Sequence, residues 1–549
     1  MNYSSIRFSV FWILVVAGIS ITCMACPPHA GNDAKIKPKT VKKAAAASNG
    51  EATLFLMADI RGVLRPCGCT LELRKGGFDR LAPYLAAERK AHPDSRLLHA
   101  GPLFFGESQP AKNKQAQRRR QAEVVADVVK RVKLDIIAGS AVDIAASKGK
   151  YDSLIKAANV QITAANLAHS NGQYPYPRFV VEKIGSLRVG IFALASPGEQ
   201  KALGKAWKIV PPAQATKETL AALAPRSDVV ILLSSLGLRY TKRLVRKVKG
   251  IHFAVVGGLG EHPIVSDEAE QVGGTRVMQF HREGRFVGRL TVVVRDGSTT
   301  FLDMSAPSKT ELEVMDARIK QLEDALKRWS KDRKASDPAV ASARHTLASL
   351  KTERESLRKP RPKPPKEKSH FSFRVTALPW DLPQDPDIAA LMSAFDTELK
   401  QINLKHAAKL PQAKPGQAVY VGLEKCLECH DETENYWKHD RHSKAWATLV
   451  KDNKTFDAEC VSCHVTGYGK AGGSVVGKTK DRENVQCEVC HGPGSLHAEA
   501  EEGKEKSTIA VKPTEALCVT CHNKHHSPHF DFDKYRAKLL VPGHGKPVK

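Results

Sequence analysis

The 549-residue sequence lacks isolated cysteines, and it lacks long apolar runs after its first 26 residues. Its 12 cysteines are clustered: two near the N-terminus, one Cys-Gly-Cys pair, and eight between Cys426 and Cys521. Scattered cysteines would predict a disulfide framework, whereas clusters at short fixed spacing predict attachment of a cofactor or a metal. Because no later segment is apolar enough to span a bilayer, a protein with several membrane spans is excluded.

The N-terminal apolar run has the features of an export signal. Arg7 precedes an uninterrupted stretch of apolar or small residues from Phe8 to Thr22. Cys23-Met-Ala-Cys26 then resembles a lipoprotein processing site, with Cys26 as the residue to be lipidated. An uncleaved anchor and simple secretion are the alternatives. We therefore expect an exported protein on the periplasmic side of a bacterial membrane, attached to it by lipid or anchor.

Acidic residues are few relative to basic ones, and the formal net charge is +27. Residues 418–549 contain 19 Lys plus Arg and 19 Asp plus Glu, so the basic excess lies in the rest of the chain. The basic runs are in linkers of an exported chain, so nucleic acid is not an expected partner. Anionic headgroups near the N-terminal tether fit this charge better.

Changes in composition along the chain divide it into five segments. The segments are a signal peptide (1–26), a flexible basic tether (27–50), a layered α/β domain (51–300), a helical hairpin with a Pro/Lys linker and a return to the α/β body (301–417), and a C-terminal domain (418–549).

Short apolar runs alternating with amphipathic stretches predict the α/β layers. The expected strands are Thr53–Met57, Leu97–Ala100, Leu134–Ala138, Val160–Ala164, Val189–Leu194, Val229–Leu233, Phe253–Val256 and Leu290–Val294. The expected helices are Gly77–Lys90, Ala116–Val132 and Thr216–Ala224. From Leu312 to Leu357 apolar residues recur every three or four positions, which predicts two antiparallel helices.

The most specific pattern is Cys-x-x-Cys-His, which occurs four times near the C-terminus. The copies are Cys426-Leu-Glu-Cys429-His430, Cys460-Val-Ser-Cys463-His464, Cys487-Glu-Val-Cys490-His491 and Cys518-Val-Thr-Cys521-His522. Two cysteines at this spacing can form thioethers with the two vinyl groups of one haem, and the next residue can bind the iron. The sequence therefore predicts four c-type haems, each with the motif histidine as its proximal ligand.

Zinc is the main alternative to haem, since four Cys-x-x-Cys pairs can form two four-cysteine sites. Zinc gives no reason for a histidine after every pair. Zinc ribbons are also mostly intracellular, whereas this chain carries an export signal. We therefore favour haem.

The second axial ligand decides whether a haem only carries electrons or also binds a substrate. Additional histidines in this region are His439, His442, His497, His525, His526, His529 and His544. We expect at least three six-coordinate haems, with the fourth using His529 or staying open. Four haems in so short a segment must form much of its core, so removing them should unfold it.

The order of segments YVGLEKCLECH, HSKAWATL, CVSCHVTGYG and VQCEVCHGPGSLH resembles the tetrahaem cytochrome c-554 family over residues 418–549. The resemblance implies a mainly α-helical domain with haems stacked in close pairs, and electron transfer outside the cytoplasm. It also implies His442, His497 and His544 as the preferred distal ligands, and that one haem can be five-coordinate.

Residues 51–300 resemble the metallophosphoesterase fold of secreted nucleotidase-like enzymes, in an order of landmarks that begins at Asp59-Ile-Arg61. The active family holds two metals with Asp-x-His, Gly-Asp, Gly-Asn-His and later histidines, and here only Asp59 is kept. The replacements are Arg61 for the first histidine, Pro102 for the bridging aspartate, Ser140 and Ala141 for Asn-His, and Ser235 for a later histidine. Loss of these ligands predicts a catalytically silent scaffold; an unrelated α/β domain is the alternative.

Cys67-Gly-Cys69 is expected in the loop after the first strand. With one residue between them, a mutual disulfide would be strained. Structural thiols, a redox-active pair and a pair of metal ligands all stay open, and the nearby Arg65 and Arg74 favour reactivity only weakly.

These patterns together favour an electron carrier that passes electrons to redox partner proteins, rather than an enzyme. One alternative is a haem oxidoreductase acting on a small nitrogen or oxygen compound at a five-coordinate haem. A nucleotidase-like hydrolase is the other, and the missing metal ligands oppose it.

Overall fold

The computed structural model describes residues 49–66, 75–258, 268–279, 282–295, 297–305, 309–332, 338–358, 366–407, 409–504, 507–523, 527, 530–542 and 544–546. By its internal contacts the chain divides into residues 1–44 and 45–549. The expectations for the export signal, for most of the tether, and for Cys26, Cys67, Cys69 and His529 lie outside the described residues.

The first of two large sheets has seven strands in the order β14-β15-β13-β1-β2-β3-β4. Strands β1 to β4 run parallel to one another, and β13 pairs antiparallel with both β1 and β15. The strands are β1 (Gly50–Ala58), β2 (Arg96–Ala100), β3 (Ile136–Ala138), β4 (Gln161–Thr163), β13 (Phe286–Val294), β14 (Leu302–Asp303) and β15 (His370–Ala377).

The second sheet has six strands in the order β11-β12-β10-β9-β7-β6, with antiparallel pairing at both edges. Its strands are β6 (Phe179–Ile184), β7 (Leu187–Leu194), β9 (Val229–Ser234), β10 (Phe253–Val256), β11 (Ala269–Val272) and β12 (Thr275–Met278). A small antiparallel pair joins β5 (Leu167–His169) to β8 (Trp207–Ile209).

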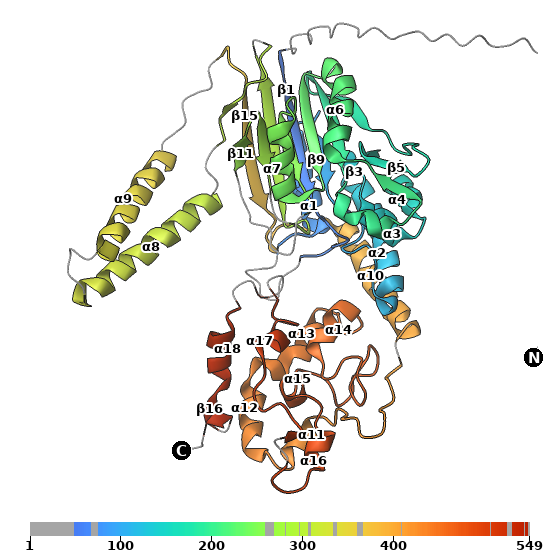
Figure 1. The fold of residues 1–549 in the computed structure, drawn as a ribbon, viewed down its shortest axis with the longest axis vertical. Coiled ribbons are helices and arrows are strands. Elements are labelled where there is room, and N and C mark those ends of the chain that lie inside the picture. The colour runs from blue at the N-terminus through green and yellow to red at the C-terminus, as the bar shows by residue number, and fades with distance from the viewer. Residues whose placement is uncertain are drawn as a thin grey trace, which may run out of the picture. The chain divides into compact units, whose positions relative to one another are not determined.

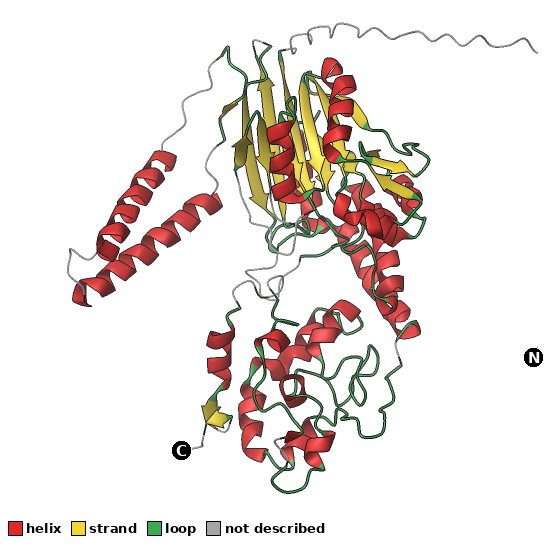
Figure 2. Ribbon diagram, in the orientation of Figure 1, coloured by secondary structure: helices red, strands yellow, loops and turns green. Residues whose placement is uncertain are grey.

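Alternating side chains on these strands build a helix–sheet–sheet–helix sandwich (Figure 2). On β1, Leu54 and Leu56 belong to the core between the two sheets, together with Ile231 of β9. The intervening Phe55 and Met57 face the helices outside the first sheet. Helices α6 and α7 cover the outer face of the second sheet (Figure 1). The helices of the body are α1 (Phe78–Ala91), α2 (Gln115–Arg131), α3 (Ala141–Ser147), α4 (Tyr151–Ala158), α5 (Gln200–Leu203), α6 (Pro212–Leu223), α7 (Gly237–Lys247) and α10 (Pro386–Lys405).

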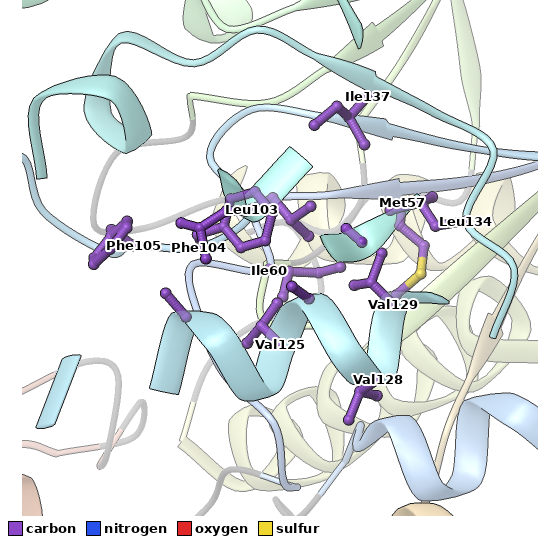
Figure 3. Packing of buried hydrophobic residues seen from close by; sticks show 14 of the residues in the cluster. Met57, Ile60, Leu103, Phe104, Phe105, Val125, Val128, Val129, Leu134 and Ile137 are labelled. Carbon is purple, nitrogen blue, oxygen red and sulfur yellow. The ribbon is translucent and has the colours of Figure 1, made fainter. Parts of the chain in front are cut away.

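Figure 3 shows the packing of α2 against the first sheet. Val125 and Val129 lie beside Ile60 and Met57, and each of these side chains is at most 1% exposed. Burial of each such side chain stabilises the fold by about 1.5–3 kcal/mol relative to exposure. Apolar packing on the outer face of the first sheet therefore fixes the position of α2.

Two long helices, α8 (Lys309–Asp332) and α9 (Pro338–Arg358), lie side by side (Figure 1). Arg354 pairs with Asp316 at 2.9 Å and Lys351 with Glu323 at 2.7 Å, so the two helices run antiparallel. The predicted hairpin is confirmed. The chain then returns to the body as β15 and α10, as predicted.

Short helices and loops make up the C-terminal region. They are α11 (Leu423–Leu427), α12 (Glu434–His439), α13 (Ala445–Lys451), α14 (Ala458–His464), α15 (Cys487–His491), α16 (Ser495–Ala498), α17 (Glu515–Cys518) and α18 (Phe532–Leu539), with the strand pair β16 (Val541–Pro542) and β17 (Gly545–Lys546). Its buried apolar cluster is small: Leu449, Ala458, Val461, Val465 and Val476.

The predicted fold class, a layered α/β domain with a helical hairpin and a mainly helical C-terminal region, is confirmed. All eight expected strands are present, whereas the short or edge strands β5, β6, β8, β11, β12 and β14 were not predicted. The proposed segment boundaries stay predictions. Within the part of the chain that the structure describes, no helix combines the length and apolar character needed to cross a membrane.

Candidate haem-binding site

The four Cys-x-x-Cys-His motifs lie on or at the ends of the short helices α11, α14, α15 and α17. In α14 and α15 the whole motif is helical, which places its first cysteine, second cysteine and histidine at positions i, i+3 and i+4. Residues at this spacing share one side of a helix. Both thiols and the imidazole can therefore reach the same ring.

Three motif histidines each face a second histidine that is distant in sequence. The ring centroids are 6.1 Å apart for His430 and His497, 6.0 Å for His442 and His522, and 6.2 Å for His491 and His544. A histidine nitrogen binds a transition metal at about 2 Å, so two rings on opposite sides of one iron have centroids roughly 6 Å apart. The structure thus brings together His442, His497 and His544, the distal ligands implied by the resemblance, with three of the four motif histidines.

Four histidines of this region, three of them in the pairs, direct Nδ1 to a carbonyl or carboxylate oxygen. Nδ1 lies 2.6 Å from the Ala445 carbonyl oxygen in His464, 2.7 Å from that of Ala510 in His491, and 2.6 Å from that of Leu539 in His544. In His442 it lies 2.8 Å from Asp440 Oδ1. An Nδ1–H donated to an oxygen leaves Nε2 as the ligand atom, which is the usual arrangement of a metal-binding histidine.

The fourth motif histidine, His464, differs from the others. Among the described residues no histidine ring faces it; its Nδ1 contacts the Ala445 carbonyl and, at 3.3 Å, the Thr448 hydroxyl. His529, the expected alternative, lies outside the described residues. The haem of the second motif is therefore the one for which an open axial position stays a prediction.

His522 is enclosed by aromatic rings. Phe530 stacks on it with a centroid distance of 5.0 Å, and Tyr535 lies at 5.8 Å. Burial first, and then the neighbouring His442, lower the pKa of His522. A lowered pKa keeps the imidazole neutral, as an iron ligand must be.

A buried carboxylate connects the first motif to the third. Glu488, between Cys487 and Cys490, is 1% exposed. It accepts hydrogen bonds from the backbone N–H groups of Val421 and Gly422, at 2.9 and 2.7 Å, and from that of Gly494 at 2.7 Å. The start of α11 is thereby held against α15. This role was not predicted, because a glutamate inside a Cys-x-x-Cys motif gives no sequence signal of burial.

Thiols of different motifs also approach one another. The thiols of Cys426 and Cys487 influence each other's pKa, as do those of Cys463 and Cys521. Burial and the nearby Cys518 raise the pKa of Cys490, so the third motif also neighbours the fourth.

The donor set and its geometry fit haem. Four pairs of thiols with the spacing of thioether attachment, and three histidine pairs at the spacing of two ligands of one iron, suit a c-type haem group. Within the described residues no group of three or more His, Cys, Asp or Glu side chains is arranged to hold a metal ion directly. The zinc alternative, which needs four cysteines around one ion, gains no support from this geometry.

The landmarks of the α/β domain serve structural roles. Asp59 Oδ1 accepts a hydrogen bond from Gly258 N at 2.9 Å, and Asp59 Oδ2 lies 3.5 Å from Arg61 Nη2. Ser140 caps α3 by accepting from Asp143 N at 3.2 Å. The arginine thus occupies the space beside the one retained carboxylate.

Two further acidic groups near Asp59 were not predicted. Asp143 is fully buried and accepts hydrogen bonds from the backbone N–H groups of residues 103–105. Burial raises its pKa to about 7, although these hydrogen bonds oppose the shift. Burial, with the nearby Asp143 and Asp59, also raises the pKa of Glu199 to about 7. Asp143 ends the landmark segment that begins at Ala138, but no role was predicted for it, and Glu199 belongs to no motif, so only the fold reveals their proximity to Asp59.

The comparisons with known proteins agree with this division of the chain. Residues 425–492 match the family model described as cytochrome c554 and c-prime. Cytochrome c-554 of Nitrosomonas europaea is 34% identical over 99 residues, which cover 15% of this chain and 42% of that protein. The chain therefore spans less than half the length of this curated relative.

Several solved structures are similar to part of this chain. A calcineurin-like phosphoesterase from Bacillus subtilis is 18% identical with a TM-score of 0.37, covering 46% of this chain and 88% of that one. A 5'-nucleotidase precursor from Thermus thermophilus is 17% identical with a TM-score of 0.44, covering 67% and 61%. At these values the likeness implies nothing about activity.

Proposed function

We propose that this protein is an exported c-type cytochrome that carries electrons through four covalently bound haems. The observation that carries the proposal is the set of three opposed histidine pairs, each about 6 Å across, at three of four Cys-x-x-Cys-His motifs. The similarity to cytochrome c-554 over residues 425–492 supports it.

Each motif has a defined role in this proposal. Its two cysteines form the thioethers, and its histidine is the proximal ligand. The distal ligands are His497 for the first haem, His544 for the third and His442 for the fourth. When bound, each haem supplies an iron that gains and loses one electron. The chain holds the imidazoles of His442, His464, His491 and His544 in place through their Nδ1 hydrogen bonds. It also brings neighbouring motifs close enough for electrons to pass between haems.

A pyridine haemochrome assay beside an intact-mass measurement tests the proposal. Mature protein from a host that attaches c-type haem should contain four haems per chain, and its mass should include them. The same mass reveals whether Cys26 carries lipid, as we propose for its attachment to the periplasmic face of a membrane. Colourless protein, or zinc in place of haem, would refute the proposal.

A second function is favoured by one observation, the absence of a described histidine facing His464. An open position on the second haem would allow reaction with a small nitrogen or oxygen compound. Cyanide or nitric oxide should then change the absorption of one haem only. A spectrum that is wholly low-spin and indifferent to both ligands would exclude this function. No observation favours a hydrolase, because Arg61 lies beside the one retained metal-ligand position.

A further inference from the structure

The α/β body contacts the C-terminal region beside one attachment helix, α14, which carries the second motif. These contacts come from α2 with the turn before it, and from α10. The contacting pairs are Gln117–Asp457, Asn403–Phe456, Asp396–Lys454, Lys114–Glu459, Arg118–Glu459 and Lys400–Phe456.

A buried polar bridge lies at the centre of this contact. Gln117 and Asn403 are 2% and 4% exposed. Asn403 Nδ2 donates to Gln117 Oε1 at 2.8 Å and to the Phe456 carbonyl at 2.6 Å. Gln117 Nε2 in turn donates to Asp457 Oδ1 at 2.8 Å. A buried amide left without a hydrogen-bond partner destabilises the fold, so each partner holds the other in place.

Asp457, at the end of this bridge, is the N-cap of α14. Its Oδ1 also accepts a hydrogen bond from Glu459 N at 3.0 Å. Its carbonyl accepts from Cys460 N at 3.0 Å and from Val461 N at 2.9 Å. N-caps of this kind define where a helix begins. The body therefore holds the residue that starts the helix of the second motif.

Ion pairs reinforce the bridge. Lys454 Nζ lies 2.7 Å from Asp396 of α10 and 3.6 Å from Asp457. Burial alone would lower the pKa of Lys454, but Asp457 and Asp396 together raise it. Glu459 pairs with Lys114 at 2.9 Å and with Arg118 at 3.0 Å. Opposite charges thus meet on both sides of the start of α14.

We propose that the α/β body acts as a clamp on α14 and thereby tunes the reduction potential of the second haem. The α14 clamp consists of Gln117, Asp396, Asn403, Lys454 and Asp457. It holds one end of the helix, and His464 lies at the other end with its Nδ1 2.6 Å from the Ala445 carbonyl. The inference rests on the proposed function, because it assigns the scaffold a role in the chemistry of one of the four haems.

The direction of the effect follows from the hydrogen bond of His464. Donation of Nδ1–H to a carbonyl makes an imidazole a stronger electron donor to its metal. Loosening the clamp lets α14 move and weakens this bond, so the oxidised iron is stabilised less. The potential of the second haem should therefore rise, while the others keep their ligands and their potentials. Gln117, Asn403 and Lys454 are in this sense positioning residues.

The test uses the full-length haem-loaded protein and the double variant Gln117→Leu/Asn403→Leu, which changes no charge. Potentiometric titration followed by absorption and electron paramagnetic resonance gives the potential of each haem. A Cys460→Ala/Cys463→Ala variant, with one haem fewer, identifies the signal of the second haem. Gln384→Leu is the matched control, because Gln384 bonds Asp79 within the body at 2.8 Å, away from α14.

We expect the double variant to raise only the potential of the second haem, changing its oxidised-to-reduced ratio at a fixed potential by about fivefold. The milder Asn403→Ser should shift it in the same direction if the double variant folds poorly. An unchanged second haem, or an equal shift of all four, would overturn the clamp. Fewer than four haems in the wild-type protein would instead refute the proposed function, so the two failures are distinguishable.

Discussion

At the scale of single residues, the proposed binding of iron depends on hydrogen bonds that orient histidine side chains. His464, His491 and His544 each direct Nδ1 to a backbone carbonyl, and His442 directs it to Asp440. A fixed Nδ1 leaves Nε2 available in one direction only. The tautomer and the ring orientation needed for iron are thus set by the polypeptide.

Substitution of one distal ligand should change one haem. His544 faces His491 at 6.2 Å and stacks on Tyr436 at 4.6 Å. We expect His544→Ala to convert one of the four haems from low spin to high spin, measured by absorption and electron paramagnetic resonance. His439→Ala is the control, because His439 Nδ1 contacts the Asn435 carbonyl at 2.8 Å and its ring faces no described histidine. Identical spectra for His544→Ala and wild type would show that His544 is not a ligand.

Because of Glu199, the α/β body should be less stable at neutral pH than at acidic pH. Burial raises its pKa from 4.5 to about 7, so the folded state binds its proton more tightly than the unfolded chain. This tighter proton binding stabilises the folded state; the contribution is fully present below pH 4.5 and is lost as the pH rises to about 7. Glu199→Gln should flatten this part of the curve of melting temperature against pH. The exposed Glu51→Gln should leave the curve as it is, and a wild-type slope in Glu199→Gln would contradict the assignment.

At the scale of elements, short helices and the long hairpin differ in what stabilises them. An isolated helix shorter than about 12 residues is marginal in water, so α11, α14, α15 and α17 depend on caps, tertiary contacts and their haems. The hairpin of α8 and α9 packs on itself instead, and its residues do not belong to the large core clusters of the described body.

Deletion of the hairpin should leave the rest of the protein intact. Replacing residues 306–365 by a flexible linker of roughly ten residues would span the end of β14 and the start of β15. We expect unchanged haem absorption and a melting temperature of the body close to that of the wild type, measured by circular dichroism. A substantial drop in that temperature would show that the hairpin supports the body.

At the scale of the whole molecule, the two folded parts are built on different cores. The body has three extensive apolar layers, one between its two sheets and one on the outer face of each sheet. The described part of the C-terminal region buries one small apolar cluster. So small a cluster cannot offset the conformational entropy lost by more than a hundred residues. In the proposed function the haems supply the missing core.

Expression without haem attachment should therefore unfold the two parts unequally. We expect limited proteolysis to degrade residues 418–549 rapidly and to leave a body that ends near α10. Haem-loaded protein is the control and should resist cleavage at the same protease concentration. A C-terminal region that resists cleavage without haem would contradict the prediction, because it would have to be stabilised by an ordinary apolar core.

Much of the architecture can be predicted from local patterns. Apolar runs such as Val229–Leu233 identified the buried strands, and the spacing from Leu312 to Leu357 identified the hairpin, because periodicity records which side chains are buried. The edge strand β11 and its neighbour β12 have four residues each and mixed composition, and no pattern distinguished them from loops.

The sequence by itself determined the number of attachment motifs and their chemistry, because thioether formation and proximal ligation involve close neighbours in the chain. Only the tertiary structure decided that His430 faces His497, that His491 faces His544 and that His522 faces His442, because a distal ligand comes from a distant part of the chain. The bridge from Gln117 and Asn403 to Asp457 has the same origin. Contacts between distant segments depend on how the elements pack, and packing leaves no signature in local spacing.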